Sequence, residues 1–154
     1  MAALLILLTL TFNFYSAEVV ENDTVIERAE FSSLSFEYRG VEEGTDITYH
    51  QTPAYLFGLT LLNFILATST IFLFKRRQLQ VKLTHLSVLL IGAKLLLVFL
   101  YYIDKAEEMM QGNIDEMGYG VSLYLLLVSI LLFILARRAI IADEKLVKSS
   151  ERIR

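Results

Sequence analysis

The sequence predicts an all-α membrane protein, with four transmembrane helices in a bundle and a small acidic extracytoplasmic segment that has the character of a β-hairpin. Two observations predict this fold class. The 154 residues are 55% hydrophobic and 20% charged, whereas an ordinary soluble domain is ~45–50% apolar and ~25% charged. The charged residues are also clustered, so that long stretches of the chain carry none.

Composition excludes several other classes of protein. The apolar content is too high for a disordered chain. The absence of cysteine excludes a disulfide scaffold and a cysteine-ligated zinc or iron–sulfur site. The net charge of −3 gives no basic face for nucleic acid. The partners we expect are therefore the lipid bilayer and either another membrane protein or further copies of this chain.

Four segments are candidates to cross the bilayer, and together they predict a single domain over residues 1–154. A spanning helix needs ~20 mostly apolar residues to cover ~30 Å of hydrocarbon. Segments 54–74 and 118–136 contain no charged side chain, and segment 83–103 contains one. Segment 1–17 is also uncharged but short for a span.

Segment 1–17 has two interpretations. A secretory signal peptide has a basic start and small residues at positions −3 and −1 of its cleavage site. Here no Lys or Arg precedes the apolar run, and cleavage after Ala17 would place Tyr15 at −3. These features favour a retained first helix, whether complete or truncated, over a cleaved signal peptide, although the second interpretation stays open.

The distribution of charge predicts the orientation, because Lys and Arg accumulate in cytoplasmic loops. Segments 75–82 and 137–154 together contain ten basic residues. Segments 18–52 and 104–117 contain three basic residues and fourteen acidic ones. We therefore expect both termini in the cytoplasm, segment 18–52 outside, and the tail 137–154 as a cytoplasmic continuation of the fourth helix.

The outer segment has one clear pattern of β-structure. From Leu34 to Tyr38 apolar and polar residues alternate strictly, which is typical of a half-buried strand. Gly40 and Gly44 then indicate turns, and residues 47–49 are a candidate returning strand. Because a two-stranded hairpin is only marginally stable alone, it is expected to rest on the bundle or on a partner.

Lys94 is the one charged residue inside a predicted span. It follows Leu83 by 11 residues, near the middle of its segment. A lysine at a helix centre costs roughly 2.5–3.5 kcal/mol on insertion scales, so it is a functional hypothesis by default. One interpretation is structural: the side chain snorkels or binds polar groups of the bundle. The other is a site for an anion, a lipid headgroup or an acidic residue of another subunit. The polar neighbours available in the other spans are Asn63, Thr68, Ser69, Ser122, Tyr124 and Ser129.

The basic residues of the inner face also have two interpretations. The predicted orientation alone explains most of these basic residues, because Lys and Arg accumulate in cytoplasmic loops. A role in cytoplasmic docking or lipid contact is the alternative, because basic clusters beside a membrane attract anionic lipids. The candidate residues are Lys75, Arg76, Arg77, Lys82, Arg137, Arg138, Lys145, Lys148, Arg152 and Arg154.

Residues suited to catalysis or to metal binding are sparse. His50 lies in the outer segment and His85 at the inner end of the third span, so the predicted topology separates them. Glu42, Glu43 and Asp46 have the pattern of a solvated acidic face rather than of a cation site. We therefore expect no catalytic residues, no metal and no cofactor.

Two segments carry a resemblance to a known family. Residues 70–83 read Thr-Ile-Phe-Leu-Phe-Lys-Arg-Arg-Gln-Leu-Gln-Val-Lys-Leu, and the tail reads Leu-Ala-Arg-Arg-Ala-Ile at 135–140 and Asp-Glu-Lys-Leu-Val-Lys-Ser-Ser-Glu-Arg-Ile-Arg at 143–154. Both resemble the domain-of-unknown-function 4293 family, small four-span proteins found mainly in the Bacteroidetes. The resemblance implies a bacterial inner membrane and supplies no activity. A basic, Gln-containing stretch that usually opens the family's first span is missing, which suggests a truncated N-terminus.

The sequence therefore leads to one preferred functional hypothesis. We expect a non-enzymatic interaction or assembly component of a membrane complex. The alternative is a small transporter or channel subunit that uses Lys94 in the membrane. An intramembrane enzyme is disfavoured, because no acid–base pair lies at a shared depth.

Overall fold

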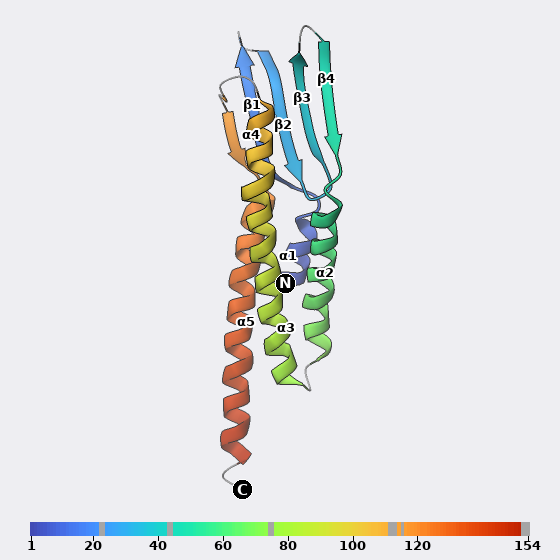
Figure 1. Ribbon diagram of the computed structural model, residues 1–154. Helices are drawn as coiled ribbons and strands as arrows, with labels where there is room; N and C mark the ends of the chain where they lie inside the picture. The colour runs from blue at the N-terminus through green and yellow to red at the C-terminus, as the bar shows by residue number, and fades with distance from the viewer. Residues whose placement is uncertain (22–23, 43–44, 74–75, 111–113, 115, 152–154) are drawn as a thin grey trace.

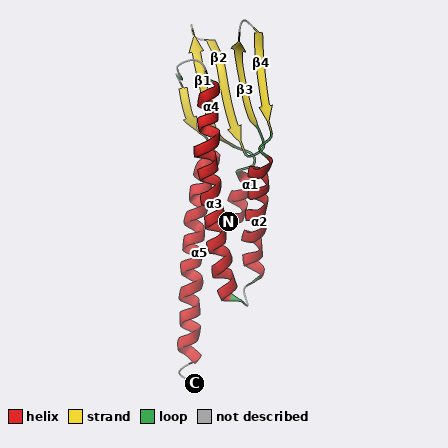
Figure 2. Ribbon diagram, viewed as in Figure 1, coloured by secondary structure: helices red, strands yellow, loops and turns green. Residues whose placement is uncertain are grey.

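The protein consists of a helical bundle with a β-sheet at one end (Figures 1 and 2). The computed structural model describes residues 1–21, 24–42, 45–73, 76–110, 114 and 116–151. The elements in chain order are α1 (Ala2–Leu8), β1 (Asn13–Glu21), β2 (Thr24–Ser32), β3 (Phe36–Glu42), β4 (Thr45–Gln51), α2 (Ala54–Phe72), α3 (Arg77–Leu97), the π-helical turn η1 (Val98–Ile103), α4 (Asp104–Met109), β5 (Glu116–Tyr119) and α5 (Val121–Glu151).

The predicted all-α four-helix bundle is wrong. The structure is mixed, with a five-stranded antiparallel sheet in the order β4-β3-β2-β1-β5 and helices that pack beside one another below it. Within the described residues, three helices are long and apolar enough to cross a membrane by length and composition, and they lie within Ala54–Phe72, Arg77–Met109 and Val121–Val147. The second of these combines α3, η1 and α4 into one continuous rod.

Segment 1–17 accounts for part of the error. Its helix α1 has only 7 residues, and the chain then turns and enters β1 at Asn13. The apolar residues of α1 and of β1 follow one another without an intervening charge, so the two elements have the composition of one helix. Phe14, Tyr15 and Ala17 are buried in the sheet rather than facing lipid.

The outer segment forms four strands rather than two. β3 and β4 form the expected hairpin, in which Tyr38 is opposite Tyr49. Leu34, however, is exposed and lies in the turn before β3, where the Ser32 hydroxyl accepts from the Ser35 amide at 2.9 Å. β1 and β2 were not predicted from the sequence, because the face of these strands that is buried includes small and acidic side chains, namely Ala17, Ala29 and Glu27. These side chains interrupt the alternation of apolar and polar residues that identifies a strand.

The rod Arg77–Met109 connects the two parts of the molecule. Its outer third lies in front of β1 and β2 (Figure 1). The Tyr102 ring stacks on Phe31 with 4.1 Å between centroids and also approaches Phe36 at 6.3 Å. The Tyr102 hydroxyl donates to the hydroxyl of Tyr55 on α2. One face of the sheet is thus covered by aromatic packing against helices, and this packing contains the largest buried side chains of the protein.

Candidate functional site

The structure places Lys94 in a buried polar cluster where the bundle meets the sheet. Its side chain is 3% exposed. The amino group donates to Thr60 Oγ1 at 2.6 Å, to Ser33 Oγ at 3.0 Å and to Thr9 Oγ1 at 3.5 Å. Its nitrogen also lies 4.9 Å from the centroid of the Phe14 ring. Three donors therefore meet three acceptors, which is the full hydrogen-bonding capacity of a lysine.

Each of the three hydroxyls is itself directed by a backbone carbonyl. Thr60 donates to Leu56 O at 2.7 Å, and Thr9 donates to Ile6 O at 2.7 Å. Ser33 donates to Thr9 O at 3.2 Å. Because the hydroxyl hydrogens are used in this way, the oxygen lone pairs face the amino group of Lys94. The amino group of Lys94 therefore finds an acceptor for each of its three N–H donors among these hydroxyls and does not need a carboxylate partner.

The cluster joins elements that are far apart in sequence. Thr9 follows α1, Ser33 lies between β2 and β3, Thr60 is on α2 and Lys94 is on α3. Ser122 on α5 adds a fifth element, since its hydroxyl donates to the carbonyls of Phe12 and Thr9. Of the neighbours expected from the sequence, only Ser122 takes part. Thr60, which lies in the predicted span 54–74, was missed although its hydroxyl is the closest partner of Lys94. Ser33 and Thr9 were missed because no sequence signal indicated that the strand connections enter the bundle.

The depth of Lys94 differs between the helices that meet it. Thr60 is only six residues after the first residue of α2, which is about 9 Å of helix. Lys94 therefore lies at the sheet end of α2, while it is near the middle of the continuous rod Arg77–Met109, as expected from the sequence. At this level it fastens the sheet, α1 and α2 to the longest helical rod.

The face of the sheet that the helical rod does not cover is charged. Alternate positions of β1 to β4 place acidic and basic side chains side by side: Arg28 contacts Glu18 at 3.2 Å and Glu30 at 2.5 Å. Glu37 lies 3.6 Å from Arg39 and 3.7 Å from His50. We call this surface the charged face, and its members are Glu18, Arg28, Glu30, Glu37, Arg39, Asp46, Thr48 and His50.

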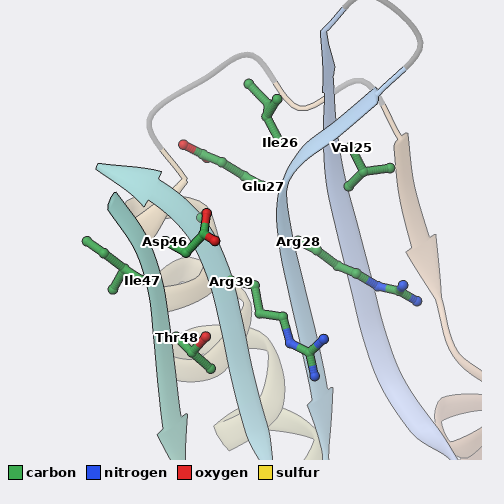
Figure 3. A pocket seen from close by; sticks show the side chains of 9 residues that line it. Val25, Ile26, Glu27, Arg28, Arg39, Asp46, Ile47 and Thr48 are labelled. Carbon is green, nitrogen blue, oxygen red and sulfur yellow. The ribbon is translucent and has the colours of Figure 1, made fainter. Parts of the chain in front are cut away.

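The two hairpins of the sheet separate at the end that is away from the helices. Pairing between β2 and β3 covers Arg28–Phe31 on one strand and Phe36–Arg39 on the other. Beyond Arg28 and Arg39 the strands diverge (Figure 1). A cavity of about 400 Å³ lies between them, and Figure 3 shows the side chains of Arg28, Arg39 and Asp46 around it. This opening is continuous with the charged face.

The face of the sheet that packs against the helices is mainly aromatic and apolar. Burial, together with the nearby Glu107 carboxylate and Tyr119, raises the pKa of Tyr15 to about 12. The Tyr15 hydroxyl has no hydrogen-bond partner among the described residues. Lys105 of α4 reaches across to β4, where it donates to Gln51 Oε1 at 2.7 Å and lies 5.1 Å from the Tyr49 ring centroid.

The predicted basic residues gather at the opposite end of the bundle from the sheet. Arg77, at the start of α3, pairs with Asp143 of α5 at 3.0 Å. Arg137 and Arg138 lie on α5 beside His85 of α3, around one hollow. Arg76, Lys82 and Lys145 are exposed or partly exposed nearby. Lys75, Arg152 and Arg154 lie outside the described residues, as does the side chain of Lys148.

No metal centre emerges from the described part of the chain. No group of three or more His, Asp or Glu side chains there could hold a metal ion. His50 is in β4 and His85 is in α3, at opposite ends of the molecule. Of the three acids read as a solvated face, Asp46 lies beside the opening between the hairpins. Glu43 and the side chain of Glu42 lie outside the described part.

Comparison with known proteins gives one assignment. No functionally curated protein matches the chain. The profile of the family described as "Domain of unknown function (DUF4293)" matches residues 1–153, which is nearly the whole chain. The extent of this match shows that the protein belongs to the DUF4293 family.

Proposed function

We propose that this protein is a non-enzymatic assembly component of a bacterial inner-membrane complex, in which the charged face of the sheet binds another envelope protein on the extracytoplasmic side. The observation that carries the proposal is the contrast between the two faces of the sheet. One face is packed against helices through Tyr102 and its aromatic neighbours. The other presents ordered, alternating charges that no described element covers.

The charge pattern also favours a particular kind of partner. Among the charged-face residues, Glu18, Glu30, Glu37 and Asp46 outnumber Arg28 and Arg39. A partner surface with an excess of basic groups would complement this face, and such complementarity sets specificity and association rate more than raw affinity. The separation of the hairpins adds unpaired strand edges, which extended segments of other proteins can join.

The orientation in this proposal follows from charge. The basic end of the helices, with Arg76, Arg77, Arg137 and Arg138, is placed in the cytoplasm, and the sheet is placed outside. Helix lengths support a membrane position, since α2 has 19 residues, about 28 Å.

The transport alternative has less support. A lysine that lines a pathway would be expected to face water or an ion. Lys94 is buried and its three donors are used by Thr60, Ser33 and Thr9. Its position therefore favours a structural role within the buried polar cluster over a role in transport.

Photo-crosslinking in the native membrane tests the proposal. A photoreactive amino acid replaces Thr48 on the charged face in the full-length chain, and Leu89 on the outside of α3 in a control. We expect one discrete crosslinked protein from position 48 and lipid or no adduct from position 89. Reversing charge with Glu37→Lys should reduce the position-48 adduct severalfold, while Glu107→Lys on α4 should leave it unchanged.

Two outcomes would contradict the proposal. One is the absence of a protein adduct from position 48 and from a second charged-face position, Arg39, at normal membrane levels of the chain. The other is an identical set of adducts from positions 48 and 89, because random collision in the membrane would produce it.

A further inference from the structure

A hollow between α3 and α5 combines an apolar wall with cationic side chains that have no ion-pair partner in the described part of the chain. It has a volume of about 390 Å³ and lies at the end of the bundle away from the sheet. Val88, Phe133, Ile134 and Ile141 supply the apolar wall. The polar part of the lining consists of Thr84, His85, Arg137 and Arg138.

Among the described residues, the polar lining contains no acidic residue. Within the described part of the chain, neither Arg137 nor Arg138 has a carboxylate within ion-pair distance, in contrast to Arg77 close by, which pairs with Asp143. Both arginines and His85 are exposed. Guanidinium groups bind phosphate oxygens through two parallel hydrogen bonds, so this lining is suited to a phosphate group.

The hollow lies at the depth where phospholipid headgroups begin. The Arg77–Asp143 pair places the start of α3 level with residue 143 of α5. Arg138 is five residues, about 8 Å, farther into the bundle. From Arg137 to the start of α5 at Val121 is sixteen residues, about 24 Å, which is close to the ~30 Å of hydrocarbon in a bilayer.

A second hollow adjoins the first but has a different lining. It has a volume of about 250 Å³, shares Thr84 and Phe133 with the first and is otherwise lined by residues of α1, α2, α3 and α5 such as Ala3, Thr70, Gln80 and Ile140, together with Met1. Among the described residues, its lining includes no Arg, Lys or His side chain. The guanidinium groups that suit a phosphate are therefore found in the first hollow and not in its neighbour.

We propose that the hollow between α3 and α5 is a binding site for one anionic phospholipid, with its phosphate on Arg137 and Arg138 and an acyl chain against Val88 and Ile134. His85 supplies a further N–H donor at the rim. The site is at the other end of the molecule from the charged face, so it can exist whether or not that face binds a protein.

Lipid titration followed by native mass spectrometry tests this site. The full-length protein in mild detergent is titrated with phosphatidylglycerol and, separately, with phosphatidylethanolamine. We expect one phosphatidylglycerol to bind more tightly than phosphatidylethanolamine. The double variant Arg137→Gln/Arg138→Gln should weaken phosphatidylglycerol binding by about 30-fold, since each cation near an anionic surface contributes about fivefold. The matched variant Arg76→Gln/Lys145→Gln removes the same charge from outside the hollow and should weaken it less than threefold.

A variant that fills the hollow tests the contribution of its shape separately from the contribution of its charge. Ile134→Trp fills the hollow at an exposed position and leaves both arginines in place, so it should also abolish tight binding while the thermal unfolding midpoint is retained. Equal losses in the two double variants would overturn the proposal, because diffuse attraction would then explain the binding. Equal binding of both lipids would overturn it too. Displacement of phosphatidylglycerol by a soluble poly-glutamate peptide would instead identify an acidic protein segment as the occupant.

Discussion

Lys94 illustrates how a single residue changes meaning once its surroundings are known. In the sequence it is an isolated charge in an apolar segment. In the structure it is a donor to three hydroxyls, each oriented by a carbonyl. A buried charged group that loses one partner costs more than the same group replaced entirely by an apolar side chain of similar shape. The role of Lys94 can therefore be measured by comparing a variant that removes one of its partners with a variant that replaces the lysine itself.

We expect Thr60→Val to be more destabilising than Lys94→Met. Thr60→Val removes the closest acceptor and leaves the amino group incompletely paired, at a cost of about 1–3 kcal/mol. Lys94→Met keeps the length of the side chain and leaves the hydroxyls bonded to their carbonyls, so its cost should be below about 1 kcal/mol. Thermal unfolding in detergent micelles measures both. The double variant should resemble Lys94→Met alone, and strict additivity of the two changes would contradict this account.

At the scale of elements, the long helices and the hairpin of β3 and β4 were predictable, and β1, β2 and β5 were not. Runs 54–74, 83–103 and 118–136 correspond to α2, to the rod Arg77–Met109 and to α5, because an apolar helix in lipid is recognised by length and composition alone. The tail continues helical to Glu151, as expected. β1 and β2 were missed because their covered face mixes Ala and Glu with aromatic residues, which weakens the alternation that identifies a strand.

The junction between β5 and α5 depends on a glycine. The Gly120 amide donates to Phe14 O at 2.8 Å, and a Cβ at position 120 would lie 1.9 Å from Asn13 O. Gly120→Ala must therefore displace the backbone of β1, and we expect a loss of about 1–3 kcal/mol. Gly92→Ala is the control, because a Cβ there meets nothing within 4 Å and helix propensity favours Ala by up to about 1 kcal/mol. Equal unfolding midpoints for the two variants would contradict the close contact at Gly120.

At the scale of the whole molecule, the net charge of −3 averages two oppositely charged ends. Acidic residues dominate the sheet, and basic residues dominate the far end of the helices. Sorting of charge along a membrane protein predicts its orientation. The proposed protein contact and the proposed lipid site then lie on opposite sides of one membrane, joined by the rod Arg77–Met109.

Cysteine labelling tests this orientation directly, since the chain has no native cysteine. Thr48→Cys on β4 and Ala142→Cys on α5 introduce thiols at two exposed positions without changing charge. In intact spheroplasts, a membrane-impermeant maleimide should label position 48 at least tenfold more than position 142. After permeabilisation, both should label equally. Preferential labelling of position 142 in intact spheroplasts would reverse the proposed orientation.

The amino-acid sequence by itself determined that the protein is apolar enough for a membrane, which long segments are helical, and which end is basic. These properties depend on composition over some twenty residues, so distant contacts do not alter them. Only the tertiary structure decided that β1 to β5 form one sheet, that Lys94 meets Ser33 and Thr9, and that Arg137, Arg138 and His85 share a hollow. Strand pairing and buried polar contacts join residues that are tens of positions apart, and no local pattern specifies those pairings.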